Sequence, residues 1–208
     1  MSQLLDILLH IDRHLANLLS EYGPLTYGIL FAVIFIETGF VVMPFLPGDS
    51  LLFATGAFAA MEALDLASVL GFLSVAAILG DTVNYWIGRR LGQRAHSMQS
   101  INPSHLESAQ AFFEQHGGKA IVLARFVPII RTFTPFVAGM GRMSYPYFIF
   151  FNITGGIAWV TICCLAGYFF GNIPLVKQNF EFVILGIVVV SFIPVIIEIA
   201  KHKRRHNT

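Results

Sequence analysis

The sequence predicts an all-α integral membrane protein: a polytopic helix bundle with two oppositely facing re-entrant (broken-helix) hairpins, arranged like an inverted repeat. Three observations lead to this fold class. The 208 residues are 56% hydrophobic and only 12% charged, whereas soluble domains contain about 25% charged residues. Several apolar runs are long enough to cross a bilayer. Two further apolar segments are interrupted by prolines, glycines and charges.

Residues 1–208 are expected to form a single membrane domain, because no polar linker is long enough to divide the chain. In residues 1–22, apolar side chains such as Leu4, Leu8 and Ile11 recur at helical spacing. This pattern predicts an amphipathic N-terminal helix on the bilayer surface. A helix packed on the rest of the protein is an equally good interpretation.

Three segments have the length and composition of full membrane spans. About 20 apolar residues are needed to cross a bilayer. Residues 66–88 contain one charged side chain, Asp81, and residues 145–171 contain none. The third predicted span is 182–200.

Residues 24–60 and 119–141 are apolar but broken in their middle. Unpaired backbone is tolerated at membrane depth only where protein or water surrounds it, so both segments are predicted to be re-entrant. A charged residue in each segment is followed ten residues later by a proline: Glu37 by Pro47, and Arg125 by Pro135. This correspondence indicates a weak internal repeat, of the kind that transporters use to build a site near the midplane.

The basic residues predict the orientation. They are concentrated in the central loop, 89–118, and in the tail, 201–208. By the positive-inside rule, both the loop and the C-terminus are expected to be cytoplasmic. Within the loop, a surface helix is predicted to begin at Pro103 and to end at Gly117 and Gly118.

The first broken segment carries two carboxylates, Glu37 and Asp49. In a continuous helix they would lie about 18 Å apart along the axis. The intervening prolines make a continuous helix improbable, and a turn there could bring Asp49 back towards Glu37. Asp49 followed by Ser50 also resembles a helix N-cap, which is a purely structural alternative.

The second broken segment carries Arg125 and Arg131, with Pro128 between them. Two guanidiniums in one cavity would form an anion site, because arginine binds phosphate or carboxylate through two parallel hydrogen bonds. The alternative is that each arginine pairs with Glu37 or Asp49 to neutralise a buried charge. Both interpretations stay open, and they are compatible.

Glu37 and Asp49 are also candidates for proton coupling. Burial favours a protonated carboxyl, whereas a nearby arginine favours the ionised form, so a carboxyl between these effects can exchange protons. Asp81 and Asn84 are expected to face the bundle interior. Interhelical hydrogen bonding and a direct place in a transport pathway both remain open for them.

Other residues give weaker signals. Cys163 and Cys164 are adjacent and are interpreted as packing residues, and the aromatic Trp159 as a packing or interfacial residue. The spacing of Gly167 and Gly171 leaves a homo-oligomer open. We expect no metal site, no cofactor and no nucleic-acid partner. The absence of a recognisable nucleophile or metal-ligand set for lipid-phosphate hydrolysis argues against an enzyme.

The chain resembles the DedA family of bacterial inner-membrane proteins, which carry a VTT (SNARE-associated) domain and are related to eukaryotic lipid scramblases. The resemblance covers roughly residues 10–200. It rests on three motifs: FIETGFVVMPFLPGDSLLF, GDTVNYWIGR and HGGKAIVLARFVPIIRTFTPFVAGMGRMSY.

The resemblance implies oppositely facing hairpins, dependence on the proton motive force and movement of lipids across the inner membrane. The family's acidic pair corresponds to Glu37 and Asp49, and its arginine pair to Arg125 and Arg131. Undecaprenyl phosphate and phospholipids such as phosphatidylethanolamine are the implied substrates. We therefore expect a lipid flippase whose partners are membrane lipids and protons. The alternative is a proton-coupled small-ion antiporter that supports envelope homeostasis.

Overall fold

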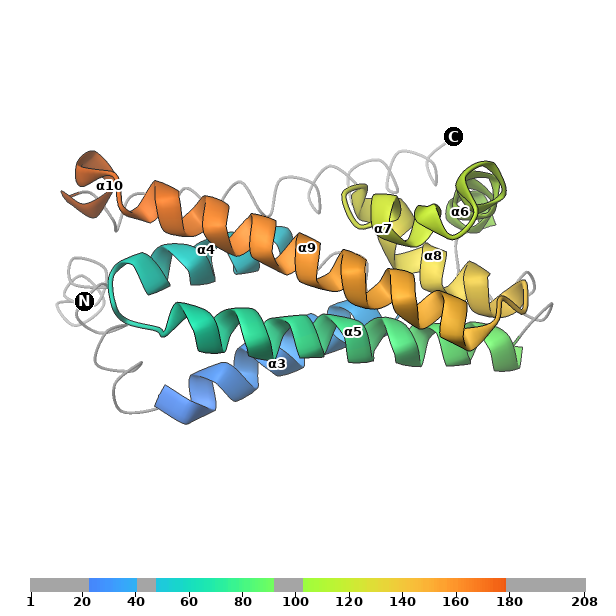
Figure 1. The fold of residues 1–208 in the computed structure, drawn as a ribbon, viewed down its shortest axis with the longest axis horizontal. Coiled ribbons are helices and arrows are strands. Elements are labelled where there is room, and N and C mark those ends of the chain that lie inside the picture. The colour runs from blue at the N-terminus through green and yellow to red at the C-terminus, as the bar shows by residue number, and fades with distance from the viewer. Residues whose placement is uncertain (1–22, 41–47, 92–102, 179–208) are drawn as a thin grey trace, which may run out of the picture. The chain divides into compact units, whose positions relative to one another are not determined.

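The structure is a computed structural model that describes residues 23–40, 48–91 and 103–178. Every regular element in these ranges is an α-helix (Figure 1). The helices are α3 (Gly23–Gly39), α4 (Gly48–Ala60), α5 (Leu66–Leu91), α6 (Pro103–His116), α7 (Lys119–Ala124), α8 (Pro128–Met140), α9 (Tyr145–Gly171) and α10 (Pro174–Gln178). The predicted N-terminal helix, the span at 182–200 and the basic tail lie outside the described residues.

Helices α5 and α9 have the properties of membrane spans. They contain 26 and 27 residues, and the mean hydropathy of the most apolar stretch of each is 1.9. At 1.5 Å per residue each is about 40 Å long, which exceeds the hydrocarbon thickness of a bilayer. The predicted spans at 66–88 and 145–171 are confirmed as long apolar helices.

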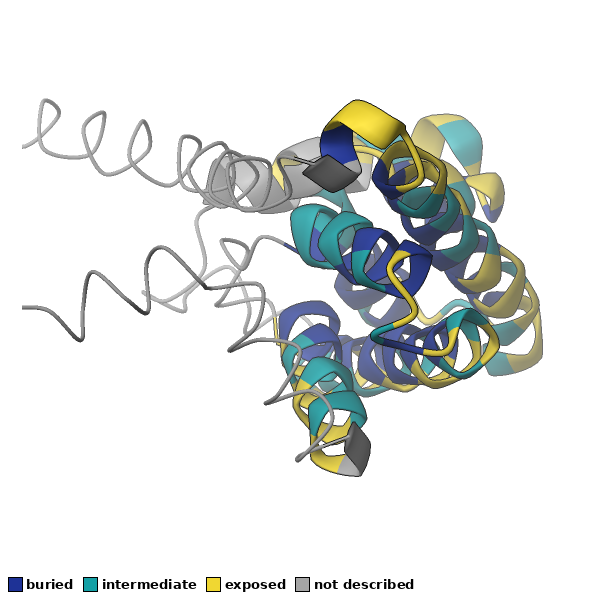
Figure 2. Ribbon diagram, turned by 90° about the vertical axis from the view of Figure 1, so that its left-hand side faces the viewer, coloured by how far each residue is buried: buried dark blue, intermediate teal, exposed yellow. Residues whose placement is uncertain are grey.

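The outer faces of these two helices are also apolar. On α5, Phe72, Val75 and Leu79 are 45–52% exposed, and on α9 Phe150 and Ile157 are 61% and 48% exposed. Figure 2 shows helices with buried residues along one side and exposed residues along the other. Exposed aliphatic and aromatic stripes of this kind are suited to lipid rather than to water.

Both proline-broken segments divide into two helices. In the second, the helical backbone is interrupted between Ala124 and Pro128, where Val127 is extended. Pro128 occupies the first turn of α8, where its missing N–H costs no helical hydrogen bond. The predicted break at Pro128 is confirmed. Pro135, by contrast, lies inside α8 and does not end it.

The predicted surface helix of the central loop corresponds to α6. It begins at Pro103, and Gly117 follows its last residue with a φ of +56°. This left-handed conformation is open to glycine without a steric cost. Phe113 of α6 packs against Phe133, Phe136 and Val137 of α8.

Packing contacts divide the chain into two compact units. One contains residues 1–28, 47–69 and 163–208, and the other contains residues 29–46 and 70–162. The long helices α5 and α9 each contribute residues to both units.

In the first unit, α4 lies directly against the C-terminal part of α9. A Cβ at Gly56 would collide with the backbone of Cys164, and one at Gly167 would collide with the backbone of Phe53. A Cβ at Gly171 would meet Ala57 at 3.0 Å. Gly167 and Gly171 thus permit close helix packing within one chain, which explains their spacing without a dimer.

The same unit contains the beginning of α5. The backbone N–H of Ser68 donates a hydrogen bond of 2.7 Å to the carboxylate of Asp65, just before the helix starts. This is the bonding pattern of an N-cap, which satisfies a backbone donor of the first turn. The hydrogen bonds with Ser68 lower the pKa of Asp65 below its ordinary value.

In the second unit, α5 and α8 approach each other through Gly88 and Gly139, whose added Cβ atoms would collide with the backbones of Phe136 and Tyr85. The ring of Tyr85 stacks on Phe148 at 4.4 Å, and its hydroxyl donates to the Met143 carbonyl. This packing holds α5, α8 and α9 together beside the polar residues described next.

A Gly167→Ala substitution is expected to lower the thermal unfolding midpoint of the purified protein. Its new methyl group meets the Phe53 backbone, and overpacking of this kind typically costs about 1–3 kcal/mol. Gly71→Ala is the matched control, because no heavy atom lies within 4 Å of a Cβ at that position. Heating followed by size-exclusion chromatography in detergent measures both midpoints. Equal midpoints would contradict the proposed packing of α4 on α9.

Candidate functional site

A buried ion pair joins α3 to α8. Glu37 is fully buried near the C-terminal end of α3, and Arg131 lies near the start of α8. Arg131 Nη2 donates to Glu37 Oε1. Each charge lies at the helix end whose dipole disfavours it, since helix C-termini favour cations and N-termini favour anions. The two charges therefore compensate each other where their own helices do not.

A second buried ion pair joins the break between α7 and α8 to α5. Arg125, at the C-terminal end of α7, donates to Asp81 Oδ2 and, at 2.6 Å, to Asn152 Oδ1 of α9. Asn152 Nδ2 in turn donates to the Ile78 carbonyl of α5 at 3.0 Å. Arg125, Asp81 and Asn152 are each at most 5% exposed. A buried charge pair is tolerated when surrounding hydrogen bonds also satisfy its atoms. Asn152 does this for Arg125 Nη2, whereas the buried Nε of Arg125 has no hydrogen-bond partner.

The aromatic ring of Trp159 lies beside both arginines. The guanidinium carbon of Arg131 is 4.9 Å from the ring centre, and that of Arg125 is 5.9 Å from it. Both distances fall in the range of cation–π interactions. The side chain of Trp159 is only 1% exposed. It is therefore a packing residue, which is one of the two interpretations of the sequence, but its contact with the arginines was not predicted.

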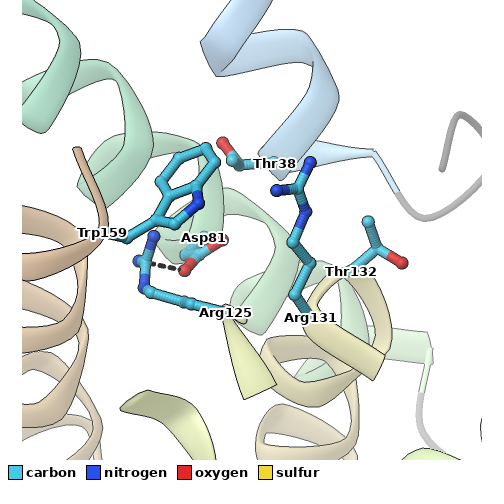
Figure 3. Close-up of a pocket in the computed structure, with 6 residues that line it drawn as sticks. All are labelled: Thr38, Asp81, Arg125, Arg131, Thr132 and Trp159. Carbon is cyan, nitrogen blue, oxygen red and sulfur yellow. Dashed lines mark hydrogen bonds and ion pairs between the residues drawn. The ribbon is translucent and has the colours of Figure 1, made fainter. Parts of the chain in front are cut away.

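These groups surround a small cavity (Figure 3). Its lining residues come from α3, α5, α8, α9 and the break after α7: Thr38, Asp81, Arg125, Arg131, Thr132 and Trp159. The space open to the centre of a water-sized sphere is about 10 Å³, which is room for about one water molecule. Two guanidiniums and a carboxylate thus line the same small cavity.

Asn84 links α3 and α8 to α5 through hydrogen bonds. Its fully buried side-chain N–H group donates to the Thr38 carbonyl at 3.2 Å and to the Thr132 carbonyl at 2.7 Å. Thr38 belongs to the end of α3, and Thr132 to the beginning of α8. Asn84 therefore supplies an interhelical link, which is one of the two roles predicted for it.

Most of the predicted site residues come together in the second unit. Glu37, Arg125, Arg131, Asp81 and Asn84 all belong to it. Asp49 belongs to the other unit, in the first turn of α4, where the helix dipole favours an acidic group. The carboxylate that pairs with Arg125 is Asp81, a pairing that the sequence analysis did not consider.

Sequence reasoning missed Asn152 and the contact of Trp159 with the two arginines. The available signal was the spacing of Asn152 and Trp159 in α9, which places both on one helix face with two glycines between them. Among the residues that the structure describes, no group of three or more His, Cys, Asp or Glu side chains could hold a metal ion.

An Asp81→Asn substitution is expected to destabilise the protein by about 3–5 kcal/mol, because it leaves the charge of Arg125 buried without its counter-ion. The double variant Asp81→Asn with Arg125→Met should recover part of this loss. Thermal midpoints of the single and double variants form a double-mutant cycle that isolates the coupling. Glu107→Gln, at an exposed carboxylate of α6, is the control and should leave the midpoint nearly unchanged. Additive effects in the cycle would contradict a coupled pair.

Comparison with known proteins gives consistent matches. The VTT domain family matches residues 46–169. Protein DedA of Escherichia coli strain K12 is 53% identical over 206 residues, covering 97% of this chain and 94% of that protein. Inner membrane protein YqjA of the same strain is 37% identical over 152 residues, or 72% of this chain and 69% of that protein.

Inner membrane protein YghB of Salmonella typhimurium is 35% identical over 156 residues, which cover 74% of this chain and 71% of that protein. No solved structure matches the chain. Arg125, Arg131, Asp81 and Trp159 all lie within the matched VTT domain, and Glu37 precedes it. The long apolar helices agree with relatives that are inner membrane proteins, and the chain belongs to the DedA family of VTT-domain membrane proteins.

Proposed function

We propose that this protein is a lipid flippase of the inner membrane, which moves a phosphate-bearing lipid across the bilayer and depends on the proton motive force. The observation that carries the proposal is that Arg125 and Arg131 line one buried cavity in a membrane protein. A charged side chain at mid-bilayer costs about 2.5–3.5 kcal/mol on insertion scales. Two such residues facing one cavity favour a binding role over a purely structural one.

The chemistry of the arginines favours phosphate as the bound group. A guanidinium presents several N–H donors in one plane, and this geometry matches the oxygens of a phosphate. In the structure the arginines bind Asp81 and Glu37 instead. A phosphate would compete with these carboxylates for the same donors. Because the cavity has room for about one water molecule, entry of a phosphate requires the ion pairs to separate.

Protonation provides a way to separate them. A proton on Glu37 removes the negative charge that holds Arg131, and the arginine then becomes available to phosphate. Loss of the proton restores the ion pair and displaces the phosphate. Asp49 is the second proposed proton carrier, although it lies in the other compact unit. Asp81 and Asn84 complete the proposed pathway around the cavity.

The proposal includes a topology. The pairs α3–α4 and α7–α8 would be oppositely facing re-entrant hairpins, and the C-terminus would be cytoplasmic. Undecaprenyl phosphate and phospholipids such as phosphatidylethanolamine are the candidate substrates that the family resemblance supplies.

Arg131→Ala is expected to reduce lipid movement at least roughly tenfold, since a charge-assisted hydrogen bond contributes about 1.5–3 kcal/mol. The assay reconstitutes the protein in liposomes with labelled undecaprenyl phosphate or labelled phosphatidylethanolamine, with and without a proton gradient. Arg90→Ala, at an exposed arginine of α5, should move lipid like the wild type. In a Glu37→Gln variant, any remaining movement should lose its response to the gradient; a full response would contradict the coupling role of Glu37.

A parallel assay tests the alternative function, a proton-coupled ion antiporter. The buried carboxylates Glu37 and Asp81 would also suit that function. Cation exchange is measured in the same liposomes for the wild type and Arg131→Ala. If the substitution abolishes cation exchange while neither lipid is moved by the wild type, the flippase proposal is wrong and the antiporter is favoured.

A further inference from the structure

One face of α9 is built around the two arginines. Four residues lie on the same side of this helix, because three of them follow the first by three, four and seven positions: Asn152, Gly155, Gly156 and Trp159. We call these four residues the arginine-docking face. The whole of α9 contains no charged residue. An amide and a tryptophan on one face of such a helix need a specific reason.

Trp159 contacts both guanidiniums through its ring (Figure 3). A guanidinium that stacks by its flat face keeps its N–H groups directed outward in its own plane. A cation–π contact with Trp159 and hydrogen bonding to an anion are therefore compatible. The interaction is also strongest where water is excluded, as it is at this buried position.

The two glycines make room for Arg125. A Cβ at Gly155 would lie 3.2 Å from both Cδ and Nε of Arg125. A Cβ at Gly156 would lie 3.4 Å from Nη2 of the same residue and 2.9 Å from Ile78. A larger residue at either position would push on the side chain of Arg125 or on a neighbour. One helical turn earlier, Asn152 Oδ1 accepts a hydrogen bond from Arg125 Nη2.

We infer that the arginine-docking face holds the guanidiniums of Arg125 and Arg131 in place for one anion, and that Trp159 is the positioning residue shared by both. This inference rests on the proposed function and deepens it. In the structure Asp81 and Glu37 bind the arginines, and in the proposed cycle they release them when phosphate enters. The contacts with α9 involve no negative charge, so they persist when an incoming phosphate replaces the carboxylates.

The chain contains two tryptophans, which makes a direct test possible. Trp86 is 41% exposed and lies beside Arg89, outside the cavity lining. Trp86→Phe therefore leaves Trp159 as the sole fluorescent tryptophan. Detergent-solubilised Trp86→Phe protein is titrated with decyl phosphate and, separately, with inorganic phosphate. We expect a saturable change in Trp159 emission, and its loss when Arg131→Met is added. A response to decyl phosphate alone identifies a lipid-like ligand, and an equal response to both identifies the phosphate group alone.

Substitutions at Trp159 test the positioning role by calorimetric titration with decyl phosphate. Trp159→Leu removes the ring and should weaken binding roughly 3- to 30-fold, whereas Trp159→Phe and Trp159→Tyr retain a stacking surface and should lose less. Gly155→Ala should also weaken binding, and Gly71→Ala, with open space around its Cβ, should not. A merely structural role would lower the thermal midpoint without this ranking by aromatic character.

The outcomes separate the two hypotheses. If the Trp86→Phe protein moves lipid in liposomes but Trp159 emission does not respond and Trp159→Leu binds normally, the inference is overturned and the proposed function stands. If emission responds in an arginine-dependent way but no lipid moves, the anion site stands and the flippase proposal fails. If neither occurs, both are overturned.

Discussion

The central physical constraint on this protein is that each buried charge must be neutralised by a partner from a different helix. Arg131 meets Glu37 across 94 positions of the chain, and Arg125 meets Asp81 across 44. These contacts attach the broken helices to the rest of their unit through polar bonds. Such bonds matter in a bilayer because lipid tails are as apolar as the side chains, so no hydrophobic effect drives helices together there.

Small residues complement the charges, because they let the two helices that carry the carboxylates approach closely. A Cβ added at Gly80 would collide with the Thr38 hydroxyl. A Cβ added at Gly39, on the facing helix, would lie 3.5 Å from the backbone of Gly80. This contact brings the end of α3 against α5, two residues from Glu37 and one from Asp81. Glycines therefore place Glu37 and Asp81 on two closely packed helices, from which each carboxylate reaches its own arginine.

The sequence predicted well those features that depend on neighbouring residues. The length of the apolar run at 145–171 predicted the bounds of α9. Pro128 has no backbone N–H to donate within a helix, and this predicted the break before α8. Pro135 was treated as equivalent to Pro47, yet α8 accommodates it. Pairings over long separations were predicted only in part. The pairing of an arginine with Glu37 is confirmed, but the partner of Arg125 could not be identified, because the local sequence around Arg125 is the same whether that partner is Asp49 or Asp81. Trp159 was missed because an aromatic residue in an apolar span has the same pattern whether it packs on leucines or on arginines.

In the proposed cycle, the ion pairs that stabilise the site are also the interactions that a phosphate would have to replace. Two guanidiniums and two carboxylates give the site no net charge, and this neutrality suits a region without bulk water. Adding a phosphate to the intact pairs would bury an excess negative charge, whereas protonating a carboxylate first keeps the sum near zero. In the proposed cycle, coupling to protons is thus a consequence of burial: the site can accept an anion at low cost only when it also accepts a proton.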